Sequence, residues 1–174
     1  WLRLRLLPES AKDARAVAKT QLDDAARRAK VAADRAAEVA PDDPAVTRAK
    51  VDALRLADDR AVARTLAPRL SSGTLAPETA YVLAALDLGE ASPPWPTVLE
   101  RLRLAATAET TPGRARAALV YALVRSGDAA GAKAEVERMA SSPRPHPLLA
   151  ELRAIVPDPA AGGDAGVKDA GADG

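Results

Sequence analysis

The sequence predicts an all-α fold in which short helices pack in pairs to form an α-solenoid. Alanine, the residue with the highest helix propensity, supplies 43 of the 174 residues. Pro and Gly gather in five short clusters, and the segments between them have the length of helices. No segment has the alternation that is typical of a strand. Leu, Ile and Val make up about a fifth of the chain, so we expect a thin core, and the net charge of +1 favours folding over disorder.

The five clusters divide the chain into predicted helices. The clusters are residues 41–44, 71–77, 91–96, 110–113 and 141–147. Ser10 with Asp13, and Thr97 with Glu100, have the spacing of a capping box, while Pro44 and Pro77 suit the first position of a helix. We therefore expect helices over residues 10–22, 25–39, 44–56, 60–70, 77–88, 97–109, 113–126, 128–140 and 147–156.

The two ends of the chain differ from the helical body, residues 10–156. Residues 1–9 form a lead-in for which we expect a strand-like or frayed start, although Trp1 followed by alternating Leu and Arg also suits the edge of an upstream membrane anchor. Residues 157–174 are rich in Asp, Ala and Gly, which predicts a disordered tail or linker. Because the chain opens at Trp1, we expect a fragment of a larger protein. Uncharged stretches reach only eight or nine residues, so we expect no membrane span, and a cytoplasmic and a membrane-tethered location both stay open.

Short acidic or Gly-containing corners recur along the body. Those at Asp24, Asp58, Gly89 and Gly127 are 34, 31 and 38 residues apart. A valine stands seven positions before each corner, and an alanine stands five positions after three of them: Val17, Val51, Val82 and Val120; Ala29, Ala63 and Ala132. A period of this length indicates a helical repeat, in which the small residue lets paired helices approach closely.

At these residues the sequence resembles the tetratricopeptide repeat family. The fourth unit matches best, with Leu119, Gly127, Ala132, Val136 and Met139 at the family's spacings. The resemblance implies about four antiparallel two-helix units over residues 10–145. It departs from the family in lacking large aromatic residues at the helix starts and in carrying an insertion at residues 91–96. A final helix with apolar Leu148, Leu149, Leu152 and Ile155 on one face is expected to cap the array.

The sequence holds little that would support catalysis, and we expect no enzyme, cofactor or metal site. The single histidine, His146, has no His or Cys partner and lies in a Pro-rich connection, so we interpret it as a loop residue. Acidic pairs at residues 23–24, 42–43 and 58–59 suit helix capping better than acid-base or calcium chemistry. The glycines lack the pattern of a phosphate-binding loop. The Arg residues alternate with acidic ones, which argues against a nucleic-acid surface.

The resemblance implies a non-catalytic scaffold that binds a protein or peptide partner in a concave groove. We expect the groove to favour an acidic peptide with an apolar anchor. The alternative is a structural spacer, or a regulatory segment of a larger membrane-anchored bacterial protein. Exposed Leu83 and Leu86 would favour binding, and a filled groove would favour the spacer. Trp95 suits either an exposed recognition residue or a packing residue, and the latter is favoured. The predicted groove residues are Arg48, Asp52, Arg55, Thr79, Leu83, Leu86, Arg114, Tyr121 and Arg125.

Overall fold

The structure is a computed structural model that describes residues 1–71 and 73–157. Within these ranges the regular elements are all helices, which confirms the all-α class. The predicted disordered tail falls almost entirely on residues 158–174, which lie outside the described residues. The elements are α1 (Leu2–Leu6), α2 (Lys12–Val39), α3 (Pro44–Leu56), α4 (Arg60–Leu66), the 3-10 helix η1 (Ala67–Leu70), α5 (Pro77–Asp87), α6 (Trp95–Thr107), α7 (Arg114–Ser126), α8 (Ala129–Ala140) and α9 (Leu149–Ile155).

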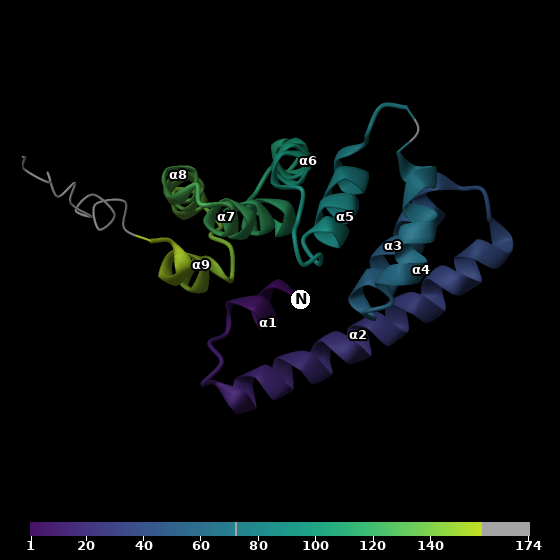
Figure 1. The fold of residues 1–174 in the computed structure, drawn as a ribbon, viewed down its shortest axis with the longest axis horizontal. Coiled ribbons are helices and arrows are strands. Elements are labelled where there is room, and N and C mark those ends of the chain that lie inside the picture. The colour runs from purple at the N-terminus through teal and green to yellow at the C-terminus, as the bar shows by residue number, and fades with distance from the viewer. Residues whose placement is uncertain (72, 158–174) are drawn as a thin grey trace, which may run out of the picture.

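Consecutive helices pack against one another along the chain. The contacts join α2 to α3, α3 to α4, α5 to α6, α6 to α7, and α7 to α8, while α3 also contacts α5. Figure 1 shows α8, α7, α6, α5 and the α3–α4 pair following one another across the molecule, with α1 and the long α2 below them. The final helix α9 packs against α7 and α8 and buries Leu152. It also contacts α1, so α9 joins the last two helices of the row to the start of the chain.

The boundaries of the middle helices follow from their local chemistry. Asp43 precedes α3 and its carboxylate accepts a hydrogen bond from the amide of Ala45 at 2.7 Å, with Pro44 in the first position. Pro77 likewise opens α5. The predicted corners at Asp58 and Gly127 both have left-handed backbone, with φ of 62° and 89°. These turns separate α3 from α4 and α7 from α8, so the predicted breaks at these two corners are confirmed.

The first predicted pair of helices is instead one continuous helix, α2, of 28 residues and about 42 Å. The predicted corner at Asp24 was wrong, because no Gly or Pro interrupts residues 12–39 and Ala favours continuing the helix. Asp23 and Asp24 lie within the helix, where they pair with Lys19 and Arg27 at 2.8 Å. Their predicted role in capping was therefore also wrong.

Three smaller predictions need correction. The lead-in is not strand-like, since residues 2–6 form α1 and its leucines Leu2 and Leu6, one turn apart, are both buried. Neither predicted capping box forms, because α2 begins only at Lys12 and α6 begins earlier than expected, at Trp95. The predicted helix over residues 60–70 changes to the tighter η1 at Ala67, next to Pro68, which lacks the amide for an α-helical hydrogen bond.

The valine and alanine positions of the repeat identify the core in the last three units. Val51, Val82 and Val120 are fully or almost fully buried on α3, α5 and α7, and Ala63 and Ala132 are fully buried on α4 and α8. In the first unit the pattern fails: Val17 is 58% exposed on α2. The core follows the periodic positions from residue 44 onward, and α2 lies outside that pattern.

Candidate functional site

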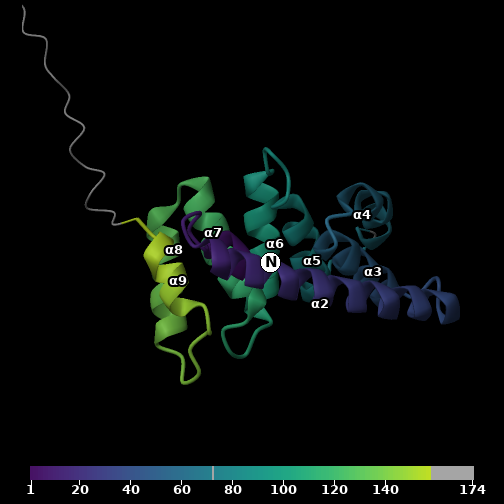
Figure 2. The same cartoon turned by 90° about the horizontal axis from the view of Figure 1, so that it is seen from below.

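The side chain of Trp1 lies against residues of three different helices. Its indole Nε1 donates a hydrogen bond to the hydroxyl of Tyr81 on α5 at 3.2 Å. Its ring meets that of Tyr121 on α7 edge to face, with centroids 6.3 Å apart. The guanidinium of Arg55 on α3 lies 5.5 Å from the centroid of its ring. The start of the chain is therefore fixed on the side of α3, α5 and α7 that faces α1 (Figure 2).

Charged side chains close a ring of contacts around Trp1. The Nε of Arg55 donates to the carboxylate of Asp52 at 3.0 Å, and Asp52 also lies 3.7 Å from Arg114 on α7. Arg114 in turn covers the ring of Tyr81 at 4.4 Å. Arg55 is only 8% exposed, so its charge requires the partner that Asp52 supplies. We call these six residues, Trp1, Asp52, Arg55, Tyr81, Arg114 and Tyr121, the Trp1 cluster.

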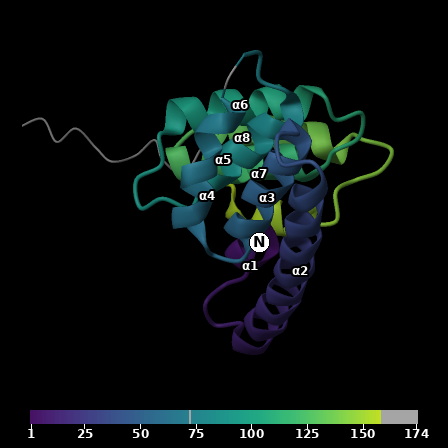
Figure 3. The ribbon, with the colours of Figure 1, turned by 90° about the vertical axis from the view of Figure 1, so that its right-hand side faces the viewer.

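The rest of α1 packs against α2 and α9. Leu2 and Leu6 face the core and are buried, whereas Arg3 and Arg5 are exposed. At the far end of the helix, Arg15 of α2 donates to the carbonyl oxygens of Leu4 and Leu7 at 3.3 and 2.6 Å. A cation at the carboxyl end of a helix satisfies carbonyl groups that have no partner within it. In Figure 3, α1 is seen between the long α2 and the row of helices that begins at α3.

Two cavities border α1. One, of about 300 Å³, separates it from α2 and from the corners after α3 and α5, and its lining includes Leu4, Leu22 and Leu88. The other, of about 350 Å³, is lined by Trp95 and Tyr121 and opens beside the loop between α5 and α6. Arg5 lines both. The surface that holds α1 is therefore larger than α1 itself.

The structure brings some of the predicted groove residues together and separates others. Asp52, Arg55, Arg114 and Tyr121 meet in the Trp1 cluster. Arg125 is exposed and lines the second cavity, and Arg48 is half-buried on α3. Thr79, Leu83 and Leu86 are buried, the two leucines at 3% and 0% exposure, so they belong to the core and line no open groove.

Sequence reasoning did not include three residues that the structure places at this site. Trp1 belonged to the predicted lead-in, and Tyr81 and Arg15 were not among the predicted groove residues. The amphipathic spacing of Leu2 and Leu6 was the available signal for a packed α1. Trp95 is partly buried against the core, as predicted for a packing residue, and it also lines a cavity.

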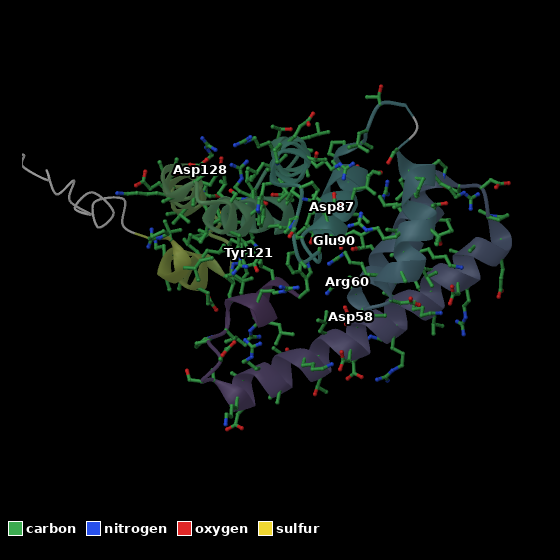
Figure 4. All side chains as sticks on the ribbon, viewed as in Figure 1. Asp58, Arg60, Asp87, Glu90, Tyr121 and Asp128 are labelled. Atoms are coloured by element: carbon green, nitrogen blue, oxygen red, sulfur yellow. The ribbon has the colours of Figure 1, made fainter. Side chains whose placement is uncertain are left out.

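A second polar cluster stabilises the packing of α4, α5 and α6. Asp87 is buried, and its two carboxylate oxygens accept hydrogen bonds from Arg64 and Arg101 at 2.6 Å each. Arg64 also binds Glu90 at 2.7 Å, and the guanidinium of Arg60 donates to the carbonyl oxygen of Gly89. Figure 4 shows Arg60, Asp87 and Glu90 between α4 and α5, and Tyr121 beneath α7 on the side of α1. Every cation here has a protein acceptor, which is the pattern of a structural cluster.

His146 and the acidic pairs, which the sequence analysis considered for catalysis or metal binding, lie in different parts of the fold. His146 lies in the loop before α9, where its Nδ1 accepts a hydrogen bond from the amide of Leu148 at 3.1 Å. Partial burial lowers the pKa of His146, opposed by the charges of Glu109 and Glu151. No group of three or more potential metal ligands occurs in the part of the chain that the structure describes. Among the helices of that part, none is long and apolar enough to cross a membrane.

Comparison with protein-family models, with curated proteins and with solved structures finds no match to this chain. The arrangement of its residues is therefore the basis for a functional proposal.

Proposed function

We propose that the protein is a non-catalytic protein-interaction module that binds a helical segment of a partner on the face formed by α3, α5 and α7. The observation that carries this proposal is the contact of Trp1 with aromatic and charged side chains of α3, α5 and α7, beside the buried Leu2 and Leu6 of α1. An amphipathic helix in an apolar groove is a common mode of peptide recognition. Trp, Tyr and Arg, which make up most of the Trp1 cluster, are the residues most enriched in binding hot spots.

We propose also that residues 44–140 form an α-solenoid of the tetratricopeptide type. Helices α3, α5 and α7 begin at Pro44, Pro77 and Arg114, so their starts are 33 and 37 residues apart, close to the family's repeat of 34. The burial of the periodic valines and alanines supports this arrangement. In such an array the first helix of each pair lines the concave face, and here α3, α5 and α7 are the first helices.

The chemistry of the site favours a different ligand from the acidic peptide that the sequence suggested. Arg55 and Arg114 both face Asp52, so one acidic side chain already offsets part of their charge within the protein. The segment that occupies the face, α1, itself carries exposed Arg3 and Arg5. Apolar and aromatic contacts, rather than an acidic ligand, would supply most of the binding energy.

A structural spacer is the second candidate, because Leu83 and Leu86 are buried and α1 fills part of the groove. Capture of partners from the native source by two charge-reversed variants distinguishes the candidates. Arg114→Glu would repel Asp52 and disturb the Trp1 cluster, whereas Arg28→Glu makes the same change on an exposed position of α2. Partners lost only with Arg114→Glu would support the interaction module. Partners retained equally by both variants would overturn binding at this face and place it on another surface, and no partner at all would favour the spacer.

A further inference from the structure

We propose that α1 is an internal ligand of this face and that the external partner is a helix with the same pattern. The pattern is an aromatic residue followed by leucines one and five positions later, with basic residues pointing outward. The proposal rests on the proposed function and adds to it both the chemistry of the partner segment and a mechanism of regulation, in which α1 must leave before the partner binds.

Helix α1 depends on other elements of the protein for its stability. A helix of five residues does not form alone in water, because the nucleation cost exceeds what one or two hydrogen bonds return. The residues that stabilise it belong to other elements: the Trp1 cluster on α3, α5 and α7, Arg15 on α2, and α9, which also contacts α1. These contacts define what the face recognises, namely an aromatic ring beside Tyr81 and Tyr121, followed by leucines on the same side of the helix.

The face beside α1 extends beyond the five residues of this helix. The cavities of about 300 and 350 Å³ border α1, and Arg5 lines both of them. Leu22 lines the first cavity, and Trp95 and Tyr121 line the second. A partner helix longer than five residues would fill this space and would bury more apolar surface than α1 does.

A short connection tethers α1 to α2. The chain leaves the helix at Leu7 in an extended conformation and passes Pro8 before α2 begins at Lys12. Release of α1 would break the contacts of Arg15 and of the Trp1 cluster, and it would leave the hydrogen bonds within α2 to α9 intact. Because it is tethered, α1 competes at a high effective concentration, so an external helix gains access only when α1 is weakened or the partner binds much more tightly.

Tryptophan fluorescence measures the release directly, because the chain has only two Trp residues and Trp95→Phe leaves Trp1 as the sole reporter. The probe is a synthetic peptide of residues 1–7 with Trp1→Phe, which carries no Trp. It is titrated into the full chain with Trp95→Phe, and into the same chain with Arg15→Ala, which loosens α1 without changing the face. We expect the peptide to shift the Trp1 emission to the red in both, with at least tenfold tighter binding to the Arg15→Ala chain.

A second peptide in which Leu2 and Leu6 are both alanine is the matched control and should produce no shift. Circular dichroism verifies that the chains are folded; if Arg15→Ala unfolds the protein, Leu6→Ala in the chain takes its place. Equal affinity for both chains, or binding without a Trp1 shift, would overturn displacement of α1 and leave the interaction module standing. The absence of any binding would overturn the inference, and the capture experiment with Arg114→Glu then decides the proposed function separately. Dimerisation of the Arg15→Ala chain would assign the face to α1 of a second copy and would also overturn the inference.

Discussion

Two acidic side chains join separate helices at the level of single residues. Asp52 connects Arg55 and Arg114 beside Trp1, and Asp87 connects Arg64 and Arg101 in the interior. Among the described residues, no buried side-chain nitrogen or oxygen lacks a hydrogen-bond partner. A buried charge that lost its partner would cost several kcal/mol, so these acids fix which helices lie together.

Ala132 tests the register of the repeat at a single position. It is fully buried where α8 packs, so Ala132→Arg would force a long charged side chain into a closed contact. We expect a loss of about 3 kcal/mol or more in the free energy of unfolding. Ala130→Arg makes the same change on an exposed position of α8 and should alter the stability by less than about 0.5 kcal/mol. Thermal melts of the two variants provide the comparison, and equal melting temperatures would contradict the register.

His146 predicts a dependence of stability on pH. Its pKa in the folded protein lies below the ordinary value of 6.5, and only the neutral ring can accept the hydrogen bond from Leu148. The unfolded chain therefore binds the proton first, so the stabilisation is complete above pH 6.5 and is lost as the pH falls through the lower folded pKa. Urea midpoints at pH 7.5 and 5.5 should differ more for the natural chain than for His146→Asn. A steeper loss in the variant would contradict this origin.

At the scale of elements, the loop before α7 shows how one side chain starts a helix. The carboxylate of Glu109 accepts hydrogen bonds from the amides of Gly113, Ala115 and Arg116 at 2.8 to 3.1 Å. A side chain on Gly113 would collide with that carboxylate, since an added Cβ would lie 2.6 Å from its Oε1. Glu109 thus caps α7 from outside the helix.

Removal of this cap should weaken the fold measurably. We expect Glu109→Ala to lower the free energy of unfolding by about 1 to 2 kcal/mol, because three amides lose their acceptor. Glu137→Ala, an exposed position on α8, is the matched control and should be nearly neutral. Urea unfolding of both variants measures the difference. Similar midpoints would show that water replaces the cap without cost.

The two halves of α2 differ in burial. Ala18 is the only buried residue of its first half, while Ala26 and Ala33 are buried further along, where α3 packs. Hydrogen exchange should therefore be faster for the amides of residues 16–24 than for those of residues 28–38. Uniform protection along α2 would contradict this prediction, because it would require its first half to pack against a further element.

At the scale of the whole molecule, local signals predicted most of the helices. Helices begin at Pro44 and Pro77, and one ends just before Gly127. These boundaries were predictable because each depends on the backbone conformation of the Pro or Gly residue itself. The prediction failed at α2, where paired Asp residues resembled a corner but the alanine-rich sequence continued the helix.

The site was predicted less completely than the fold. Positions within α3 and α7 followed from the resemblance to the repeat family, so Asp52, Arg55, Arg114 and Tyr121 were among the predicted groove residues. The contribution of Trp1 depends on a contact between residues 80 positions apart in the chain, and no local pattern contains that information. The same contact places Trp1 beside several of the predicted groove residues.

The most direct test of the central claim, that Trp1 docks between α5 and α7, is a nuclear Overhauser experiment on its indole protons. With two Trp, two Tyr, one His and no Phe in the chain, the aromatic signals are few, and Trp1→Ala identifies those of Trp1. We predict cross-peaks from the Trp1 indole to the rings of both Tyr81 and Tyr121, lost in Trp1→Ala. Trp1 signals that show cross-peaks only to residues 2–7 would contradict the docking of α1 and the recognition of a partner helix inferred from it.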